Sequence, residues 1–392
     1  MTTVSTPGAS SAATSAATSS ARPDATNPAT HVPAQGPARS AAHGWLRRRG
    51  WEIMLWLALP ALVFLLFPSY LVLASQVSAA ALFALSLDLL VGYAGLLSLG
   101  HAAFFGLGAY TAGLLSTHGW TEPLSGLAAA GLVAGVLGFL TGFVVVRVRH
   151  LAQLMVTLGI GLLIFEGASR LRDVTGGDDG LQGMVIAPLF GLFPFDLYGH
   201  TAFAYAFGVL LACFIVLTRI IDSPFGLALQ GLRDNPQRMA AIGTPGNARL
   251  RKAYTIAAIF AGIAGGLLAQ TTQFVALETL SFTLSAEVLI MLVLGGAGHR
   301  YGGLVGAAVF MIARDMLSDI NPEYWQLGIG GVMVLVVLFA PGGVLGGWRG
   351  LKEWGASRRP GGSAVGFTDG PGAGDTTAAP MPVPPSSTKA RP

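Results

Sequence analysis

Residues 124–146 read LSGLAAAGLVAGVLGFLTGFVVV, a stretch of apolar and small residues without a charged side chain. A helix needs about 20 such residues to cross the roughly 30 Å hydrocarbon core of a bilayer. A transmembrane β-strand would instead alternate apolar and polar residues over about ten positions. The stretch therefore predicts a transmembrane helix, and similar stretches recur along the chain.

The composition of the whole chain agrees with this interpretation. Its 392 residues are 53% hydrophobic and 11% charged, whereas a soluble domain is roughly 25% charged. Mean hydropathy is +0.63. Cys213 is the only cysteine, so neither a disulfide framework nor a cysteine metal site is expected. We expect an all-α polytopic membrane protein.

Ten apolar segments can be delimited, which predicts about ten transmembrane segments. The third, eighth and ninth are short or interrupted by glycine, and we expect some of these to be broken or re-entrant. The segments are 51–68, 71–91, 95–116, 124–146, 151–170, 200–219, 253–272, 284–297, 303–317 and 325–345.

Low-complexity sequence flanks these segments. Residues 1–44 are rich in Ala, Ser, Thr and Pro, and residues 351–392 are similar, so we expect a disordered N-terminal arm and a disordered C-terminal tail. Residues 45–350 form the predicted transmembrane domain. The start of the chain lacks a basic region followed by a short apolar core, which argues against a cleaved signal peptide.

The arginine distribution predicts the orientation. With an even number of spans, both termini lie on one side, and placing them in the cytoplasm puts most basic residues inside, including the loop 220–252. The loop 171–199, with Asp173, Asp178 and Asp179, then lies outside. We expect both termini to be cytoplasmic.

Polar side chains interrupt the apolar sequence between Leu87 and Gly113. Ionisable groups at membrane depth are costly and normally face the bundle interior or a wet cavity, and glycines permit a broken helix beside a polar solute. Bonding to nearby backbone at a span end is an equally good explanation. The candidate pathway residues are Asp88, Tyr93, Ser98, His101, Tyr110 and Thr111.

The loop 220–252 has the pattern of two short helices. Phe225, Leu229 and Leu232 lie on roughly one face of a predicted helix from Phe225 to Arg233. Asp234 and Asn235 can cap a second helix that starts at Pro236 and runs to Ile242, stopped by Gly243. A merely solvated basic loop would not explain the apolar face or the caps.

Other patterns indicate packing and local ion pairs. Glu166 and Arg170 have the spacing of a helical i,i+4 pair, whereas the adjacent Arg314 and Asp315 point different ways. Glu287 is expected at the membrane interface. Glycines four residues apart predict close helix contacts; these pairs are Gly131/Gly135, Gly138/Gly142, Gly262/Gly266 and Gly302/Gly306.

Four stretches together resemble one family. They are GYAGLLSLGHAAFFGLGAYTAG from Gly92, TGGDDGLQG from Thr175, FGLALQGLRDNPQRMAAIG from Phe225 and SAEVLIMLVLGGAGHRYGGLVGA from Ser285. The chain resembles, over roughly 70–345, the membrane-spanning permease of branched-chain amino acid ABC importers (LivM type). Asp88 departs from the Asn expected there, and Asp178 departs from the commoner Ser.

The resemblance implies a permease subunit that receives branched-chain amino acids from a periplasmic binding protein in the bacterial inner membrane. Implied partners are two ABC ATPase subunits and a second homologous permease in a heterodimer. The loop 220–252 would couple the ATPase to the membrane, and the coupling residues would be Phe225, Gly226, Leu229, Arg233, Asp234, Asn235 and Pro236.

No catalytic, cofactor, metal or nucleic-acid site is expected in this chain. A phosphate-binding loop needs Gly-Lys-Ser/Thr, but Lys252, Lys352 and Lys389 precede Ala, Glu and Ala. ATP hydrolysis would therefore come from partner subunits. Alternatives are a permease for urea, short amides or aromatic acids, a channel, and a secondary transporter in which Asp88, Glu166 or Glu287 binds protons or sodium.

Overall fold

The computed structural model describes residues 54, 56, 58–148, 151–189, 191, 193 and 199–320, and a few residues between 327 and 343. The predicted arm 1–44, the tail 351–392 and most of the segment 325–345 lie outside these residues. The chain divides into a unit Met1–Leu55 and a unit Trp56–Pro392. The second unit contains the helices described below.

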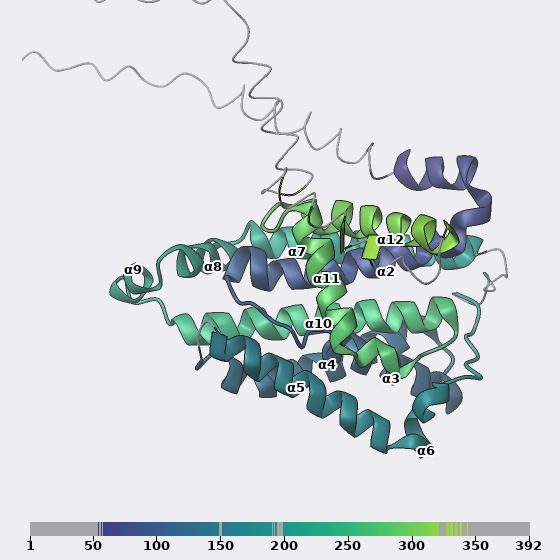
Figure 1. Ribbon diagram of the computed structural model, residues 1–392, viewed down its shortest axis with the longest axis horizontal. Coiled ribbons are helices and arrows are strands. Elements are labelled where there is room, and N and C mark those ends of the chain that lie inside the picture. Colours follow the sequence, from purple (N-terminus) through teal and green to yellow (C-terminus); the bar gives the residue numbers. More distant parts are fainter. Residues whose placement is uncertain are drawn as a thin grey trace, which may run out of the picture. The chain divides into compact units, whose positions relative to one another are not determined.

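The described part of this unit is helical, with two isolated β-bridges and no strand (Figure 1). This confirms the all-α class. The short elements are η1 (Pro68–Tyr70), α6 (Arg172–Thr175), η3 (Gly177–Asp179) and η4 (Leu277–Leu280). The longer ones are α2 (Leu71–Asp88), the π-helix η2 (Leu89–Ala94), α3 (Ala102–Thr117), α4 (Pro123–Val145), α5 (Leu151–Arg170), α7 (His200–Ile221), α8 (Pro224–Asp234), α9 (Pro236–Ala241), α10 (Gly246–Thr272), α11 (Phe282–Gly295) and α12 (Gly302–Ile320).

Five stretches of the described chain are helical and apolar over a length that suffices to cross a membrane, as a multi-pass membrane protein requires. They are Pro68–Ala94, Pro123–Val145, Leu151–Arg170, His200–Ile221 and Gly246–Thr272; α3 and α11 are apolar but shorter. Each predicted segment from 71–91 to 303–317 overlaps a helix, with differences in bounds that are given below. The total of ten segments remains a prediction.

Helix α10 packs against α2, α3 and α4 (Figure 1). The α4 glycines allow this approach, because a Cβ added at Gly138 would lie 2.4 Å from the Cβ of Ala258, and one added at Gly135 would lie 2.6 Å from Ile259. Gly306 approaches α11 closely as well, where an added Cβ would lie 1.8 Å from the Met291 carbonyl oxygen. The predicted close helix packing at glycine is confirmed.

The third predicted segment is broken. Residues 95–101 are not helical, and α3 begins at Ala102, so the predicted start at 95 was wrong while the predicted break is confirmed. Gly95 has a φ of 70°, which ends η2. Side chains satisfy the freed backbone, since the Leu99 amide donates to Thr157 Oγ1 (3.2 Å) and the Ala102 amide to Ser285 Oγ (3.0 Å).

Helix α10 begins at Gly246 and not at the predicted 253, so much of the loop 220–252 is helical. Because α10 starts earlier than predicted, Arg249, Arg251 and Lys252 belong to its first two turns. The Arg251 guanidinium lies over the ring of Phe143, 4.0 Å from its centroid. A cation on an aromatic face is stabilised by the ring quadrupole. This contact stabilises a charged residue in the first turns of α10, whose later turns are apolar.

Candidate functional site

Two capped helices, α8 and α9, follow α7. The side chain of Ser223 accepts from the Gly226 amide (3.4 Å), and Pro224 is the first residue of α8. Asn235 Oδ1 accepts from the Arg238 amide (3.0 Å), and Gly243 with φ 80° follows α9. The predicted helix pair is confirmed. Asn235 alone provides the second cap, because Asp234 is the last residue of α8.

The α8–α9 segment (residues 224–242, which include the C-cap residue of α9) has one buried and one exposed side. Leu229 and Leu232 are buried and Phe225 is half-buried, as the predicted apolar face requires. Helix α9 contains no buried residue. Leu227 is 63% exposed and Ile242 75% exposed, although both are large and apolar. The segment therefore carries an uncovered surface with apolar and basic side chains.

Helix α8 contacts the broken membrane segment. Arg233 Nη1 donates to the carbonyl oxygen of Gly92 on η2. Asp88 Oδ1, one turn earlier, accepts from the Gly298 amide at 2.7 Å. We call this contact of α8, η2 and the loop between α11 and α12 the α8 junction; its residues are Asp88, Gly92, Gly95, Arg233 and Gly298.

A second contact ties the same elements together. Arg300 Nη2 lies 2.6 Å from Asp222 Oδ1, which joins the α11–α12 loop to the end of α7. Both side chains are partly exposed, so the pair adds about 1 kcal/mol at most. The positions of α8 and of the α11–α12 loop are thus linked by charged groups as well as by backbone.

The six candidate pathway residues do not form one cluster. Asp88 belongs to the α8 junction, Tyr93 is buried on η2, and Ser98 is buried in the broken segment. Thr111 Oγ1 bonds to the Leu107 carbonyl within α3 (2.7 Å), and Tyr110 packs in an apolar cluster with Met184. Their role as a pathway stays a prediction.

His101, the sixth of them, lies at the start of α3. Its Nε2 is 2.9 Å from Ser86 Oγ, and its ring stacks on Phe83 with centroids 5.6 Å apart. Phe83 in turn contacts Phe105, with ring centroids 4.5 Å apart. His101 is therefore separated by an aromatic layer from the cavity described next.

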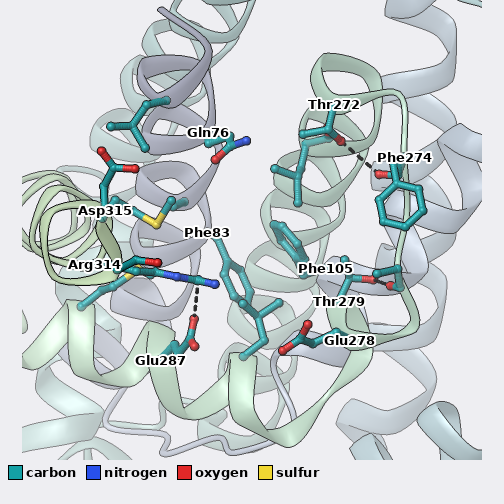
Figure 2. Close-up of a pocket in the computed structure, with 18 residues that line it drawn as sticks. Gln76, Phe83, Phe105, Thr272, Phe274, Glu278, Thr279, Glu287, Arg314 and Asp315 are labelled. Carbon is teal, nitrogen blue, oxygen red and sulfur yellow. Dashed lines mark hydrogen bonds and ion pairs between the residues drawn. The ribbon is translucent and has the colours of Figure 1, made fainter. Parts of the chain in front are cut away.

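A cavity of about 410 Å³ lies among α2, α3, α10, η4, α11 and α12 (Figure 2). We call it the α11–α12 cavity. Its volume is within the usual range of small-molecule sites. Its apolar lining includes Phe83, Phe105, Leu284, Met291 and Met311, and its charged lining is Glu278, Glu287, Arg314 and Asp315.

The charged residues come from three elements. Arg314 Nη1 on α12 lies 3.4 Å from Glu287 Oε2 on α11 (Figure 2). The sequence indicated that Arg314 and Asp315 do not pair with each other, and it placed Glu287 at the interface. It did not reveal that Glu287 and Arg314 share a cavity, because 27 residues separate them and no local pattern links them.

The carboxylates considered for ion coupling lie on different helices. Glu166 Oε1 is 2.7 Å from Arg170 Nε on the exposed side of α5, which confirms the predicted i,i+4 pair. Asp88 bonds to Gly298 at the α8 junction, and Glu287 lines the α11–α12 cavity. Among the described residues, no three His, Cys, Asp or Glu side chains converge in a way that could hold a metal ion.

Several apolar helices of membrane length, a broken segment inside the bundle and a cavity with mixed lining are the features of a polytopic membrane protein. Within this class, residues 69–338 match the family described as branched-chain amino acid transport system / permease component, and the chain belongs to that family. The family is one of transport permeases and not of enzymes.

Curated relatives agree. The chain is 33% identical over 282 residues to the high-affinity branched-chain amino acid transport system permease protein LivM of Escherichia coli (strain K12), with 67% of this chain and 66% of the relative covered. The LivM of Salmonella typhimurium gives the same values. The probable LivM of Methanocaldococcus jannaschii is 25% identical over 314 residues, covering 67% of this chain and 88% of the relative. No solved structure matches the chain.

Proposed function

We propose that the chain is the membrane-spanning permease subunit of an ABC importer in the bacterial inner membrane. In this proposal it moves branched-chain amino acids that a periplasmic binding protein delivers. Two ATPase subunits supply the energy, and a second homologous permease completes the pathway. The family match over residues 69–338 and the names of the relatives support this assignment. The match spans slightly less than two thirds of the two bacterial relatives, at 66% of each.

The proposed topology has ten membrane segments with both termini in the cytoplasm. The α8–α9 segment then lies on the cytoplasmic side, and η3 and η4 lie outside. The positive-inside distribution supports this orientation. The path of α10 is consistent with it, because α10 starts next to α8 and α9 and ends beside η4. Figure 1 shows α8 and α9 together at one end of α10.

The observation that carries the proposal is the contact of an exposed helix pair with the broken membrane helix. The uncovered side of the α8–α9 segment presents Leu227, Arg238 and Ile242, which suits a groove on an ATPase subunit. From its other side Arg233 reaches Gly92 on η2. Movement of α8 with the ATPase would therefore act directly on η2 and on the loop that holds Gly298.

Loss of the Arg233 contact should uncouple ATP hydrolysis from transport. We expect Arg233→Gln to leave insertion and complex assembly intact, because the side chain is partly exposed, and to lower ATPase stimulation by loaded binding protein at least about fivefold. The measurement is ATPase activity of the purified, reconstituted complex, with assembly followed by size-exclusion chromatography.

Arg219→Gln is the matched control, since Arg219 is an exposed arginine in the last turn of α7, outside both the α8–α9 segment and the α8 junction. ATPase stimulation of this complex should equal that of the parent. Normal stimulation in an assembled Arg233→Gln complex would contradict the coupling role. Transport by the isolated chain, without ATPase subunits, would contradict the importer assignment and favour a secondary transporter.

The substrate is tested separately on the binding protein. Calorimetry with leucine, valine, urea and a benzoate-like acid should show tight binding of the branched-chain amino acids. Tight binding of urea without heat from leucine would replace the substrate and leave the coupling role unaffected.

A further inference from the structure

We propose that the α11–α12 cavity is a substrate-binding site of the permease that recognises an α-amino acid as a zwitterion with an apolar side chain. The proposal rests on the proposed function, and it assigns the substrate a place that the sequence did not indicate. Three properties of the described lining support it: an ion pair between two helices, an excess of carboxylates and an apolar wall.

The ion pair of Arg314 and Glu287 lines the cavity. Arg314 Nη1 and Glu287 Oε2 are 3.4 Å apart, longer than the usual length of a charge-assisted hydrogen bond. Glu287 is 14% exposed and Arg314 42% exposed, so both reach the space of the cavity. A guanidinium has five donors in a planar fork and can bind a ligand carboxylate bidentately while Glu287 remains nearby.

The carboxylates favour an ammonium group. Among the described lining residues, the carboxylates of Glu278, Glu287 and Asp315 accompany one guanidinium, that of Arg314. In Figure 2, Arg314 and Glu287 approach each other on one side, and Glu278 lies on the other. A ligand with one carboxylate and one ammonium group satisfies both signs of charge at once. A phosphate or an acidic solute would be repelled by three carboxylates.

The apolar wall suits an aliphatic side chain. Phe83 and Phe105 form one part of it, and Met291 and Met311 supply flexible thioethers that adapt to branched shapes. A small polar solute such as urea would leave this surface wet. A bare cation is a poorer occupant, because no three metal-ligating side chains converge among the described residues.

Helix α2 contributes residues both to the cavity and to the α8 junction. Phe83 faces the cavity and stacks on His101, while Asp88 lies five positions further along α2 and bonds to Gly298. An occupant that displaces Phe83 therefore acts on α2, which leads directly into η2, the element that α8 contacts. This places the site where its occupancy can be sensed by the coupling segment.

Thiol protection tests the site directly. Thr272 lines the cavity, so Thr272→Cys in a Cys213→Ser background introduces one reactive thiol. The assembled complex in detergent is labelled with a maleimide in the presence of L-leucine, leucinamide or 4-methylpentanoate. Detergent exposes both faces, so the result does not depend on topology. We expect L-leucine to slow labelling, and the two analogues, which each lack one charged end, to need at least about tenfold higher concentration.

Variants of the ion pair provide the second measurement. Arg314→Gln and Glu287→Gln should each raise the L-leucine concentration for half-protection at least about tenfold, and Arg314→Lys should restore part of the loss. Glu166→Gln and Arg170→Gln are matched controls, because they alter the same residue types in an exposed pair on α5. Both controls should protect like the parent.

The outcomes separate the two proposals. Equal protection by all three compounds, or unchanged protection in Arg314→Gln, would overturn the zwitterion site. ATP-driven leucine uptake by the reconstituted complex is measured in parallel. Normal uptake without any protection overturns the cavity site and leaves the importer standing. Protection without ATP-driven uptake keeps the site and overturns the importer.

Discussion

The α8 junction and the α11–α12 cavity lie on the same helix but are built from different kinds of atoms. At the junction, two of the contacting groups are backbone atoms, the Gly92 carbonyl and the Gly298 amide, and a Cβ added at Gly92 would lie 2.1 Å from Asp88 Oδ1 and 2.4 Å from the Gly298 amide nitrogen. The cavity is bounded by side-chain ends around about 410 Å³ of space.

This difference indicates that the two regions have different roles. The close approach of the Gly92 and Gly298 backbones transmits a displacement directly, because a backbone has no rotamer to change; Arg233 and Asp88 reach these two backbones with their side chains. Side-chain ends around a cavity can exchange one partner for another at small cost. We therefore expect substitutions at the junction to act on the fold and on coupling, and substitutions in the cavity to act on ligand binding.

The largest expected effect concerns the sides of the membrane that the two regions face. Cysteines placed at Asp179 on η3 and at Asn247 at the start of α10, in a Cys213→Ser background, should react with an impermeant thiol reagent only from opposite faces. Labelling is scored on intact spheroplasts and on inverted vesicles. Reaction of both cysteines from the same face would remove the topology on which the comparison depends.

A methyl group at Gly92 should be the most damaging small change at the junction. Gly92→Ala forces apart η2 and the Gly298 loop, and overpacking of this kind costs about 1–3 kcal/mol. Gly159→Ala on α5 is the control, because an added Cβ there meets nothing within 4 Å. It should be neutral or stabilise by up to about 1 kcal/mol. Thermal unfolding in detergent measures both variants. Equal melting temperatures would show that the junction has room for a methyl group at Gly92.

Two substitutions of Asp88 should separate the contribution of its acceptor oxygen from that of its negative charge. Asp88→Ala leaves the Gly298 amide without its acceptor and should destabilise by about 1–3 kcal/mol. Asp88→Asn keeps an acceptor oxygen at the same place and should cost less than about 1 kcal/mol, the smallest effect of the series. The same thermal assay compares them. An Asn variant as unstable as the Ala variant would show that the negative charge is required.

Local patterns predicted a large part of the fold. The uninterrupted stretch 124–146 became α4, and the Asn235-Pro236 pair and Gly243 marked the start and end of α9 within one or two residues. Glycine spacing predicted the contact of α4 with another helix. These features depend on neighbouring residues or on one helix face, and such information is present in a single sequence.

The cavity and the junction could not be predicted in the same way. The Asp88–Gly298 hydrogen bond joins positions 210 residues apart, and the cavity collects residues from six elements. Polar residues between Leu87 and Gly113 are conspicuous in the sequence, yet His101 is covered by Phe83 and Thr111 bonds to its own helix. Because these polar residues are close in the sequence, we expected them to share one site. The packing of the helices instead places them in separate surroundings.

Helix α10 has a mechanical consequence of its own. Its 27 residues give a continuous rod of about 40 Å. Near its middle, Gly262 is wedged between α3 and α4, where an added Cβ would lie 2.4 Å from that of Ala134. Such a tight contact would act as a pivot about which α10 tilts. On one side of the pivot, Gly246 lies beside Leu232 of α8, and on the other side Thr272 lines the cavity. A tilt of about 5° swings the longer side by roughly 2 Å and the shorter side by roughly 1.3 Å in the opposite direction.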